Sequence, residues 1–233
     1  MKLSVSVIIP ALNEEKTIAQ AIQSVVKICQ VALADYEVIV YNDGSTDRTG
    51  TIAETLAKKN HRIRVIHNPK NLGLGFIFRD CLRHAKKSRF MFYPGDADMA
   101  SWSLLELMKN AHRADLVIGY PRRAAARPLG RRIISKTFIA LLNFLLGLSF
   151  TYYTGPFICK VAPVKRLPLK SHGFTAFFEF KVRLVKSGCT VYEIPFDHVG
   201  RTYGGTKVFK ITNILDTIRM ILLLFRTYRL GWL

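Results

Sequence analysis

Short apolar runs alternate with amphipathic stretches over the first half of this chain, and this alternation limits the fold more than any other feature. The run "SVSVIIP" is almost continuously apolar and stops at a proline, which is typical of a strand buried on both faces. The following "NEEKTIAQAIQSVVKI" spaces its apolar residues as a helix does, with Asn13 as the expected N-cap. Four further apolar runs repeat the strand pattern: "YEVIVY", "RIRVIHN", "RFMFYP" and "ADLVIGY". The pattern predicts a parallel α/β sheet with right-handed crossovers.

Acidic side chains collect where three of the predicted strands end. Glu14 follows the first strand, Asp43 ends the second, and Asp96 and Asp98 follow the fourth. Ligands of such sheets bind beyond the carboxyl ends of the strands, so these residues form one candidate site. Side chains two positions apart on an extended segment point to the same side, so Asp96 and Asp98 are expected to face one cation. Carboxylate oxygens suit Mg²⁺ or Mn²⁺ that is shared with substrate phosphates.

The chain is strongly basic. Its 35 Lys and Arg residues outnumber 16 Asp and Glu residues and give a formal net charge of +19, which predicts anionic partners such as nucleic acid, lipid headgroups or a phosphorylated substrate. The four cysteines show no metal-ligand spacing and are interpreted as core residues in a reducing compartment. Because the first strand begins next to the first residue, with no signal peptide ahead of it, we expect a cytoplasmic protein.

Two segments have the composition of helices that lie on a membrane surface. Residues 121–150 combine a run of arginines with "TFIALLNFLLGLSF", which is shorter than the roughly 20 residues of a spanning helix. Residues 208–233 place apolar residues on one helical face and end in "RTYRLGWL", a mixture favoured at a bilayer interface. The alternative to membrane insertion is that residues 133–150 and 208–225 pack in the protein core. We expect a peripheral or monotopic protein on the cytoplasmic face of a membrane. A partner subunit that anchors the chain to the membrane is an alternative means of attachment.

Five motifs, in their order and spacing, resemble glycosyltransferase family 2: "IPALNEE", "YNDGSTDRT", "NLGLG", "GDADM" and "RTYGGTK". The resemblance covers residues 4–207 and is strongest to the polyprenyl-phosphate branch, which includes dolichol-phosphate mannose synthase. It implies a GT-A fold, a mostly parallel Rossmann-like sheet flanked by helices, and an inverting reaction. It also implies a GDP- or UDP-sugar donor and Mg²⁺ or Mn²⁺. The GT-A domain would cover residues 1–207, including the basic interfacial segment 121–150, and residues 208–233 would form a C-terminal amphipathic helix.

The resemblance assigns roles to the residues that match the family motifs. Asp96 and Asp98 would be the catalytic pair that holds the metal and the donor diphosphate. Arg201 and Lys207 lie in a glycine-rich segment that would close over the same diphosphate. The implied nucleotide-sugar contacts are Pro10, Glu14, Tyr41, Asp43, Ala97, Arg201 and Lys207. The implied acceptor-phosphate contacts are Arg131 and Ser135, and we expect Arg122 to join them.

The chemistry of the acceptor separates the candidate functions. A hydroxyl acceptor needs a base to take its proton, whereas a phosphate monoester, with a second pKa of about 6, is already an anionic nucleophile. We therefore expect transfer of a hexose, mannose or glucose, to dolichyl or undecaprenyl phosphate. One alternative is a family 2 enzyme that glycosylates a hydroxyl of a glycolipid or glycan, with Glu179 or another acid as base. If Glu179 is not the base, we expect it to orient a basic neighbour. The other is a basic RNA- or membrane-binding protein without chemistry, although we expect no nucleic-acid partner.

Overall fold

The computed structural model describes residues 3–97, 99–122, 129–171, 173, 175–197 and 211–231, and within these ranges it contains a seven-stranded sheet. The strands lie in the order β3-β2-β1-β4-β6-β5-β7. Strand β6 is antiparallel to both of its neighbours, and the other pairs are parallel. The strands are β1 Ser4–Ala11, β2 Asp35–Asp43, β3 Ile63–Asn68, β4 Arg89–Phe92, β5 Leu116–Pro121, β6 Phe157–Lys160 and β7 Val191–Phe196. The predicted α/β sheet is confirmed.

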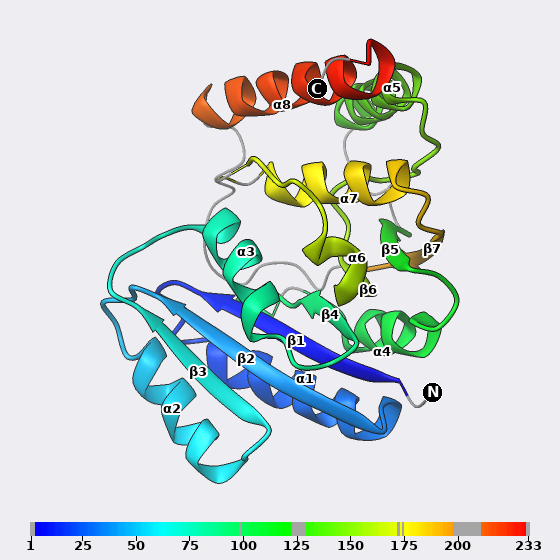
Figure 1. Cartoon of the computed structure of the whole chain (residues 1–233). Helices are drawn as coiled ribbons and strands as arrows, with labels where there is room; N and C mark the ends of the chain where they lie inside the picture. The colour runs from blue at the N-terminus through cyan, green and yellow to red at the C-terminus, as the bar shows by residue number, and fades with distance from the viewer. Residues whose placement is uncertain are drawn as a thin grey trace.

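Helices cover both faces of this sheet (Figure 1). One face is covered by α1, α2 and α4, and the other by α3 and α7. The helices are α1 Ile18–Ala32, α2 Thr49–Lys59, α3 Leu74–His84, α4 Ser101–Asn110, α5 Leu129–Leu146, α6 Val161–Lys165, α7 Ala176–Lys186 and α8 Ile211–Arg229.

Coverage on both faces explains why the first strand is an unbroken apolar run. Successive side chains of a strand point to opposite faces, so Val7 and Ile9 join the core beneath α1, while Ile8 joins the core beneath α3. The second of these cores is rich in aromatic rings. Phe180 of α7 lies with its ring centroid 4.7 Å from that of Phe78 of α3, which ties these two helices together over the sheet.

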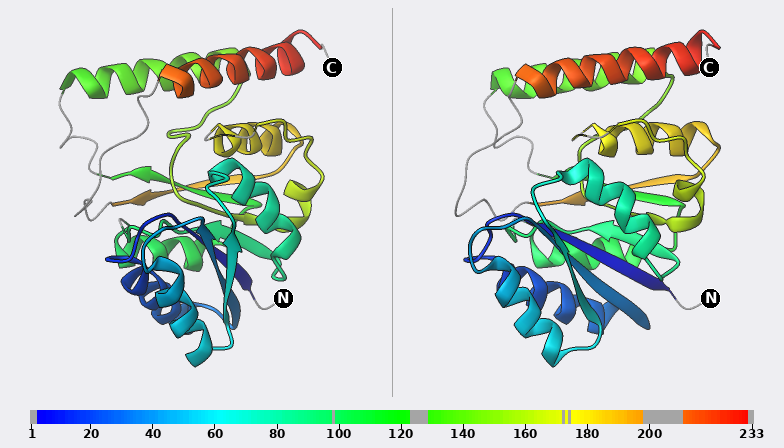
Figure 2. Two further views of the ribbon diagram at one scale, coloured as in Figure 1. Left: turned by 90° about the vertical axis from the view of Figure 1, so that its left-hand side faces the viewer. Right: turned by 60° about the vertical axis from the view of Figure 1, so that its left-hand side comes forward.

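Helices α5 and α8 form an outer layer over α7, in which they run side by side in the same direction (Figure 2). Arg229 joins their C-terminal ends, because its Nη2 donates to Phe144 O at 2.8 Å and its Nε donates to Leu145 O at 3.1 Å. A cation over the last carbonyls of a helix is favoured by the helix dipole. Among the described residues, no helix combines the length and the apolar character needed to cross a membrane. The inward faces of the outer layer bury Leu142, Leu146, Met220 and Leu224.

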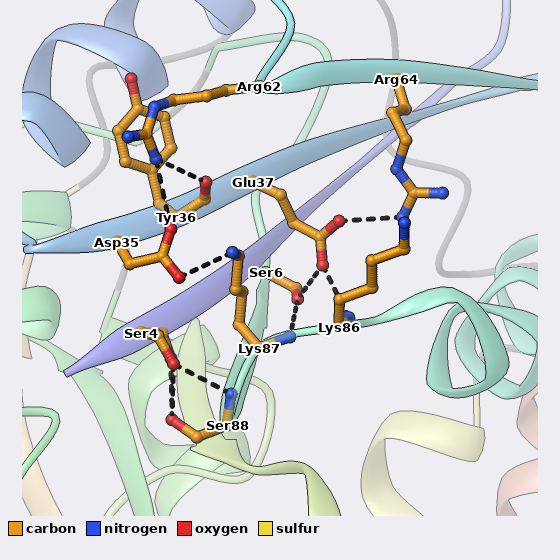
Figure 3. Close-up of polar contacts among 10 residues, drawn as sticks. All are labelled: Ser4, Ser6, Asp35, Tyr36, Glu37, Arg62, Arg64, Lys86, Lys87 and Ser88. Atoms are coloured by element: carbon orange, nitrogen blue, oxygen red, sulfur yellow. Dashed lines mark hydrogen bonds and ion pairs between the residues drawn. The ribbon is translucent and has the colours of Figure 1, made fainter. Parts of the chain in front are cut away.

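A polar network fixes the amino-terminal ends of the central strands (Figure 3). The Glu37 carboxylate accepts hydrogen bonds from Ser6 Oγ and Lys86 N, each at 2.7 Å, and from Arg64 Nη2 at 2.9 Å. Burial opposes ionisation of Glu37, but these hydrogen bonds outweigh it and lower its pKa. The network joins β1, β2, β3 and the chain that enters β4. It lies at the amino-terminal ends of these strands, so the loops at their carboxyl ends take no part in it.

Candidate active site

The loop after β1 turns at Asn13. Its φ of 57° lies in the left-handed region that residues other than glycine rarely adopt. The Oδ1 atom of Asn13 accepts a hydrogen bond from Thr46 N at 2.9 Å, which fastens this loop to the one after β2. Helix α1 begins only at Ile18, so the prediction that Asn13 caps it is wrong. Asn13 shapes the loop instead, because a short polar side chain tolerates left-handed backbone.

Glu14 and Asp43, two predicted nucleotide contacts, belong to these joined loops. Glu14 N donates to Thr49 Oγ1 at 2.8 Å, so the loop after β1 rests on the start of α2. Asp43 is buried, and its carboxylate accepts hydrogen bonds from Leu72 N and Gly73 N, each at 2.9 Å. Asp43 thereby holds the "NLGLG" loop against the end of β2. Any contact with a nucleotide stays a prediction for both residues.

Pro10 and Tyr41 lie opposite each other on β1 and β2 but differ in environment. Pro10 is half-buried, and its carbonyl oxygen packs against Gly95, where an added Cβ would lie 2.9 Å away. Tyr41 is fully buried, and its hydroxyl donates to Asp80 of α3 at 2.9 Å. Burial and the neighbouring carboxylate of Asp80 raise the pKa of Tyr41. The predicted place of these residues in a nucleotide pocket is untested.

The predicted metal-binding turn, residues 94–97, follows β4. Ala97 N donates to Pro94 O at 3.2 Å, and Ala97 has a φ of 55°, so the prediction of an extended segment is wrong at this point. Asp96 is half-buried in the turn, and Asp98 lies outside the described residues. Within the described ranges, the non-glycine residues with positive φ are Asn13 and Ala97. Backbone strain of this kind clusters at functional sites, and here it marks two neighbouring loops of the candidate site.

Hydrogen bonds that the sequence does not predict hold the end of β7 beside this turn. Ser103 Oγ accepts from Asp197 N at 2.9 Å and donates to Asp197 O at 3.3 Å, and Ala100 N donates to Asp197 O at 3.2 Å. Asp197 stands four positions before Arg201, the first residue of the motif that also contains Lys207; Arg201 and Lys207 lie outside the described residues. No sequence signal could have paired Ser103 with Asp197, because they are 94 positions apart.

The predicted acceptor-phosphate residues come from two elements. Arg122 directly follows β5, and its guanidinium carbon lies 5.7 Å from the centroid of the Trp102 ring in the first turn of α4. Because α4 begins just after the turn at residues 94–97, Arg122 and Asp96 lie at the same edge of the sheet. Ser135 is half-buried in α5, and the same helix carries Arg131, whose side chain is outside the described part.

Glu179, the alternative base, is fully buried in α7. Its carboxylate accepts hydrogen bonds from Ser171 N at 2.7 Å, Lys170 N at 3.0 Å and Arg183 Nε at 2.7 Å. The prediction that Glu179 orients a basic neighbour is therefore confirmed by its ion pair with Arg183. The same carboxylate fixes the backbone that leads into α7.

A groove of about 590 Å³ lies at the other end of the strands, away from the acidic loops. Its lining includes Lys59 and Arg62, and the Arg62 guanidinium lies 4.7 Å from the centroid of the Tyr36 ring. Tyr36 stands near the start of β2, whereas Asp43 stands at its end. The groove is therefore separate from the candidate site, which is defined by the converging loops at the carboxyl edge.

Comparison with known proteins identifies the fold and then the family. Glucosyl-3-phosphoglycerate synthase from Mycobacterium tuberculosis, solved in complex with Mn²⁺, UDP and phosphoglyceric acid, matches with a TM-score of 0.67 at 18% identity. The match covers 97% of this chain and 78% of that one, and the architecture is that of the GT-A glycosyltransferases. The sequence model of the family "Glycosyl transferase family 2" matches residues 6–170. The chain belongs to glycosyl transferase family 2.

Several curated relatives are similar over most of this chain. Glycosyltransferase AglD of Haloferax volcanii is 29% identical over 94% of this chain and 36% of its own length. The undecaprenyl-phosphate 4-deoxy-4-formamido-L-arabinose transferase of Proteus mirabilis is 26% identical over 91% of this chain and 65% of its own length. The undecaprenyl-phosphate mannosyltransferase of Micrococcus luteus is 26% identical, with 88% of each chain covered. The chain thus spans only about a third of AglD and under two thirds of the Proteus protein.

Proposed function

We propose that this family 2 enzyme is an inverting transferase that moves a hexose from a nucleoside-diphosphate sugar to a polyprenyl phosphate at a membrane surface. The names of the relatives from Micrococcus luteus and Proteus mirabilis support a polyprenyl-phosphate acceptor. The structural observation that carries the choice of acceptor is the environment of Glu179, the candidate base for a hydroxyl acceptor.

Glu179 is unsuited to take a proton from a hydroxyl acceptor. A general base must lie within hydrogen-bond reach of the proton that it removes. Glu179 is 0% exposed, and its carboxylate is occupied by Lys170 N, Ser171 N and Arg183 Nε. A phosphate acceptor needs no base, since it is already an anion near neutral pH. It needs cations to hold it, and Arg122 at the candidate site supports that role, as does Arg131 in the same basic segment.

A divalent cation would be held by Asp96 and Asp98 together with oxygens of the donor diphosphate. Carboxylate and phosphate oxygens are the ligands that Mg²⁺ and Mn²⁺ prefer. In the part of the chain that the structure describes, no group of three His, Cys, Asp or Glu side chains could hold a metal, and Asp98 lies outside that part. When bound, the cation offsets the negative charge that grows on the leaving nucleotide. Arg201 and Lys207 would add positive charge at the same diphosphate.

The outer layer would carry the enzyme to its lipid substrate. Single exposed apolar residues are normal on protein surfaces, but here they lie on two adjacent helices that also expose Lys136 and Arg226. Apolar and basic side chains on one helical surface are typical of helices that bind a bilayer interface. The N-terminal ends of α5 and α8 lie on the side of the carboxyl ends of β5 and β7 (Figure 2), which would bring the site near the headgroups. The exposed apolar residues are Ile133, Ile134, Phe138, Leu141, Phe144, Leu215, Ile218 and Leu222.

One assay tests this function. Purified protein is incubated with labelled GDP- and UDP-hexoses, with dolichyl or undecaprenyl phosphate in detergent, and with Mg²⁺ or Mn²⁺. We expect a lipid-extractable sugar phosphodiester with an inverted anomeric centre, and its loss in EDTA. Asp96→Asn should lower turnover at least about 100-fold with unchanged circular dichroism, since it removes a ligand of the cation that stabilises the leaving group. Glu106→Gln, on the exposed face of α4, is the matched control and should retain activity.

Transfer only to a hydroxyl of a glycolipid would contradict the proposed acceptor. Full activity of Asp96→Asn in EDTA would instead contradict the proposed metal site while leaving the acceptor intact.

A further inference from the structure

Lys181 is a buried amine for which the proposed mechanism has no use. It is 1% exposed in the middle of α7, and its Nζ donates to Tyr153 O at 2.8 Å and to Gly155 O at 3.0 Å. The ring centroids of Phe157 and Phe180 lie 5.0 Å and 5.8 Å from this nitrogen. Both hydrogen-bond partners are main-chain carbonyls rather than carboxylates, and burial lowers the pKa of Lys181 to about 7. A buried amine of this kind is costly, so packing alone gives no reason for a lysine here.

The backbone that Lys181 holds lies at the edge of the sheet where the candidate site forms. The wall segment, residues 151–156, leads into β6, which is antiparallel to β4 and β5. Phe157 lies opposite Ile118 and Ile158 lies opposite Met91, so the wall segment begins at the carboxyl end of β4 and lies beside the last residues of β5, where Gly119 N donates to Pro156 O. One of those strands continues into the metal-binding turn, and the other continues into Arg122.

The wall segment is fixed from two sides. On the side of β5, Gly119 N donates to Pro156 O at 2.8 Å, and a Cβ at Gly155 would lie 1.7 Å from Gly119 O. That approach excludes any side chain at Gly155. On the side of α7, Lys181 donates to the carbonyls of Tyr153 and Gly155. Thr154 stands between these two anchored residues and is exposed.

We propose that the wall segment lines the active site between the metal-binding turn and Arg122, and that Lys181 is a positioning residue that sets its place. A charged lysine has three donors and a neutral one has two, so the side chain can hold both carbonyls in either state. Because the segment lies on the β4 and β5 side of the site, Lys181 acts on the transferred sugar and the acceptor phosphate. The nucleotide, predicted to bind over β1 and β2, is outside its reach. The identity of the acceptor in this inference, a polyprenyl phosphate, rests on the proposed function.

Replacement of Lys181 by methionine tests this role, because methionine has a similar length and no donor. In Lys181→Met we expect kcat/KM for polyprenyl phosphate to fall at least about ten-fold, since small displacements of positioning groups have large kinetic effects. The dissociation constants of GDP or UDP with Mn²⁺, measured by calorimetry, should stay within about two-fold. Lys186→Met on the same helix is the matched control, because Lys186 is half-buried and reaches Gly147 O instead. Wild-type kinetics in a folded but less stable Lys181→Met would overturn the inference.

A second variant keeps the inference testable if Lys181→Met does not fold. Thr154→Trp adds bulk to the exposed wall and should lower kcat/KM for the acceptor at least about ten-fold at unchanged nucleotide affinity. Thr51→Trp, on an exposed position of α2, adds the same bulk elsewhere and should have no effect. Unchanged kinetics in Thr154→Trp would show that the segment does not line the site. A wild-type enzyme that uses another acceptor would refute only the proposed function, and the same variants would then be compared with that acceptor.

Discussion

Ala97 adopts left-handed backbone without the glycine that such geometry favours, between two residues predicted to bind metal. For an L-residue this conformation costs roughly 1–2 kcal/mol relative to the right-handed region. The hydrogen bond from Ala97 N to Pro94 O holds the turn, and Gly95 packs against Pro10 O beneath it. These two contacts hold the turn that carries Asp96 in its strained conformation.

Substitution of Ala97 by glycine tests this strain. We expect Ala97→Gly to leave the free energy of unfolding unchanged or to raise it by up to about 1 kcal/mol, because relief of strain exceeds the added entropy of the unfolded chain. Ala53→Gly, in the buried interior of α2, should lower it by about 1 kcal/mol. Urea denaturation followed by circular dichroism gives both values. Equal losses in the two variants would mean that the turn is not left-handed in solution.

Strands β5, β6 and β7 are joined at the edge away from the site by one carboxylate. Asp115 Oδ1 lies 2.7 Å from Lys160 Nζ, and Asp115 Oδ2 accepts a hydrogen bond from Thr190 N at 2.9 Å. The interaction with Lys160, followed by the hydrogen bonds from Thr190, lowers the pKa of Asp115 from 3.8 to about 2. This contact fixes the strands whose other ends lead to Arg122, the wall segment and Asp197.

The pKa of Asp115 sets a pH window for its contribution to stability. The folded pKa lies below the unfolded one, so the stabilisation is present above about pH 4 and is lost as the pH falls towards 2. Asp115→Asn should therefore lower the free energy of unfolding by about 2 kcal/mol at pH 7 and by much less near pH 2. Asp216→Asn, which removes an exposed ion pair on α8, should change it by less than about 0.5 kcal/mol at pH 7. A loss in Asp115→Asn that is independent of pH would contradict the electrostatic account.

The whole molecule has three layers of helix and sheet beneath an outer pair of helices (Figure 2). The exposed surface of this outer pair includes apolar and basic side chains. We expect the net charge of +19 to attract the chain to anionic surfaces, where the exposed apolar side chains of α5 and α8 would be buried. Because only residues 147–150 separate α5 from the wall segment, we expect attachment through the outer layer to influence the geometry of the site.

Flotation with lipid vesicles tests attachment through the outer layer. We expect binding to vesicles that contain anionic lipid, and weaker binding at high salt, because salt screens the basic surface. Ile134→Glu with Phe144→Glu should weaken binding at least about ten-fold, since each change removes a large apolar group from the interface. The matched control is Val31→Glu, which alters an apolar residue that is 76% exposed on α1. Equal binding by the double variant and the control would exclude this face.

Much of the α/β core was predictable from the sequence, because strand and helix periodicities are local. The five predicted strands are confirmed as β1 to β5. Strands β6 and β7 were not predicted, since neither short segment stands out by its pattern, and the insertion of β6 between β4 and β5 is a long-range event. The acidic loops were predicted from their place after strands, whereas the turn at Ala97 and the role of Asn13 were not.

Apolar periodicity and motif order alone determined that this chain forms a mostly parallel α/β sheet and carries the motifs of family 2, because both are properties of neighbouring residues. Only the tertiary structure decided which distant residues meet. It joined Ser103 to Asp197, enclosed Glu179 in hydrogen bonds and placed Lys181 under the wall segment. These contacts depend on strand order and on packing between elements, which no local pattern encodes.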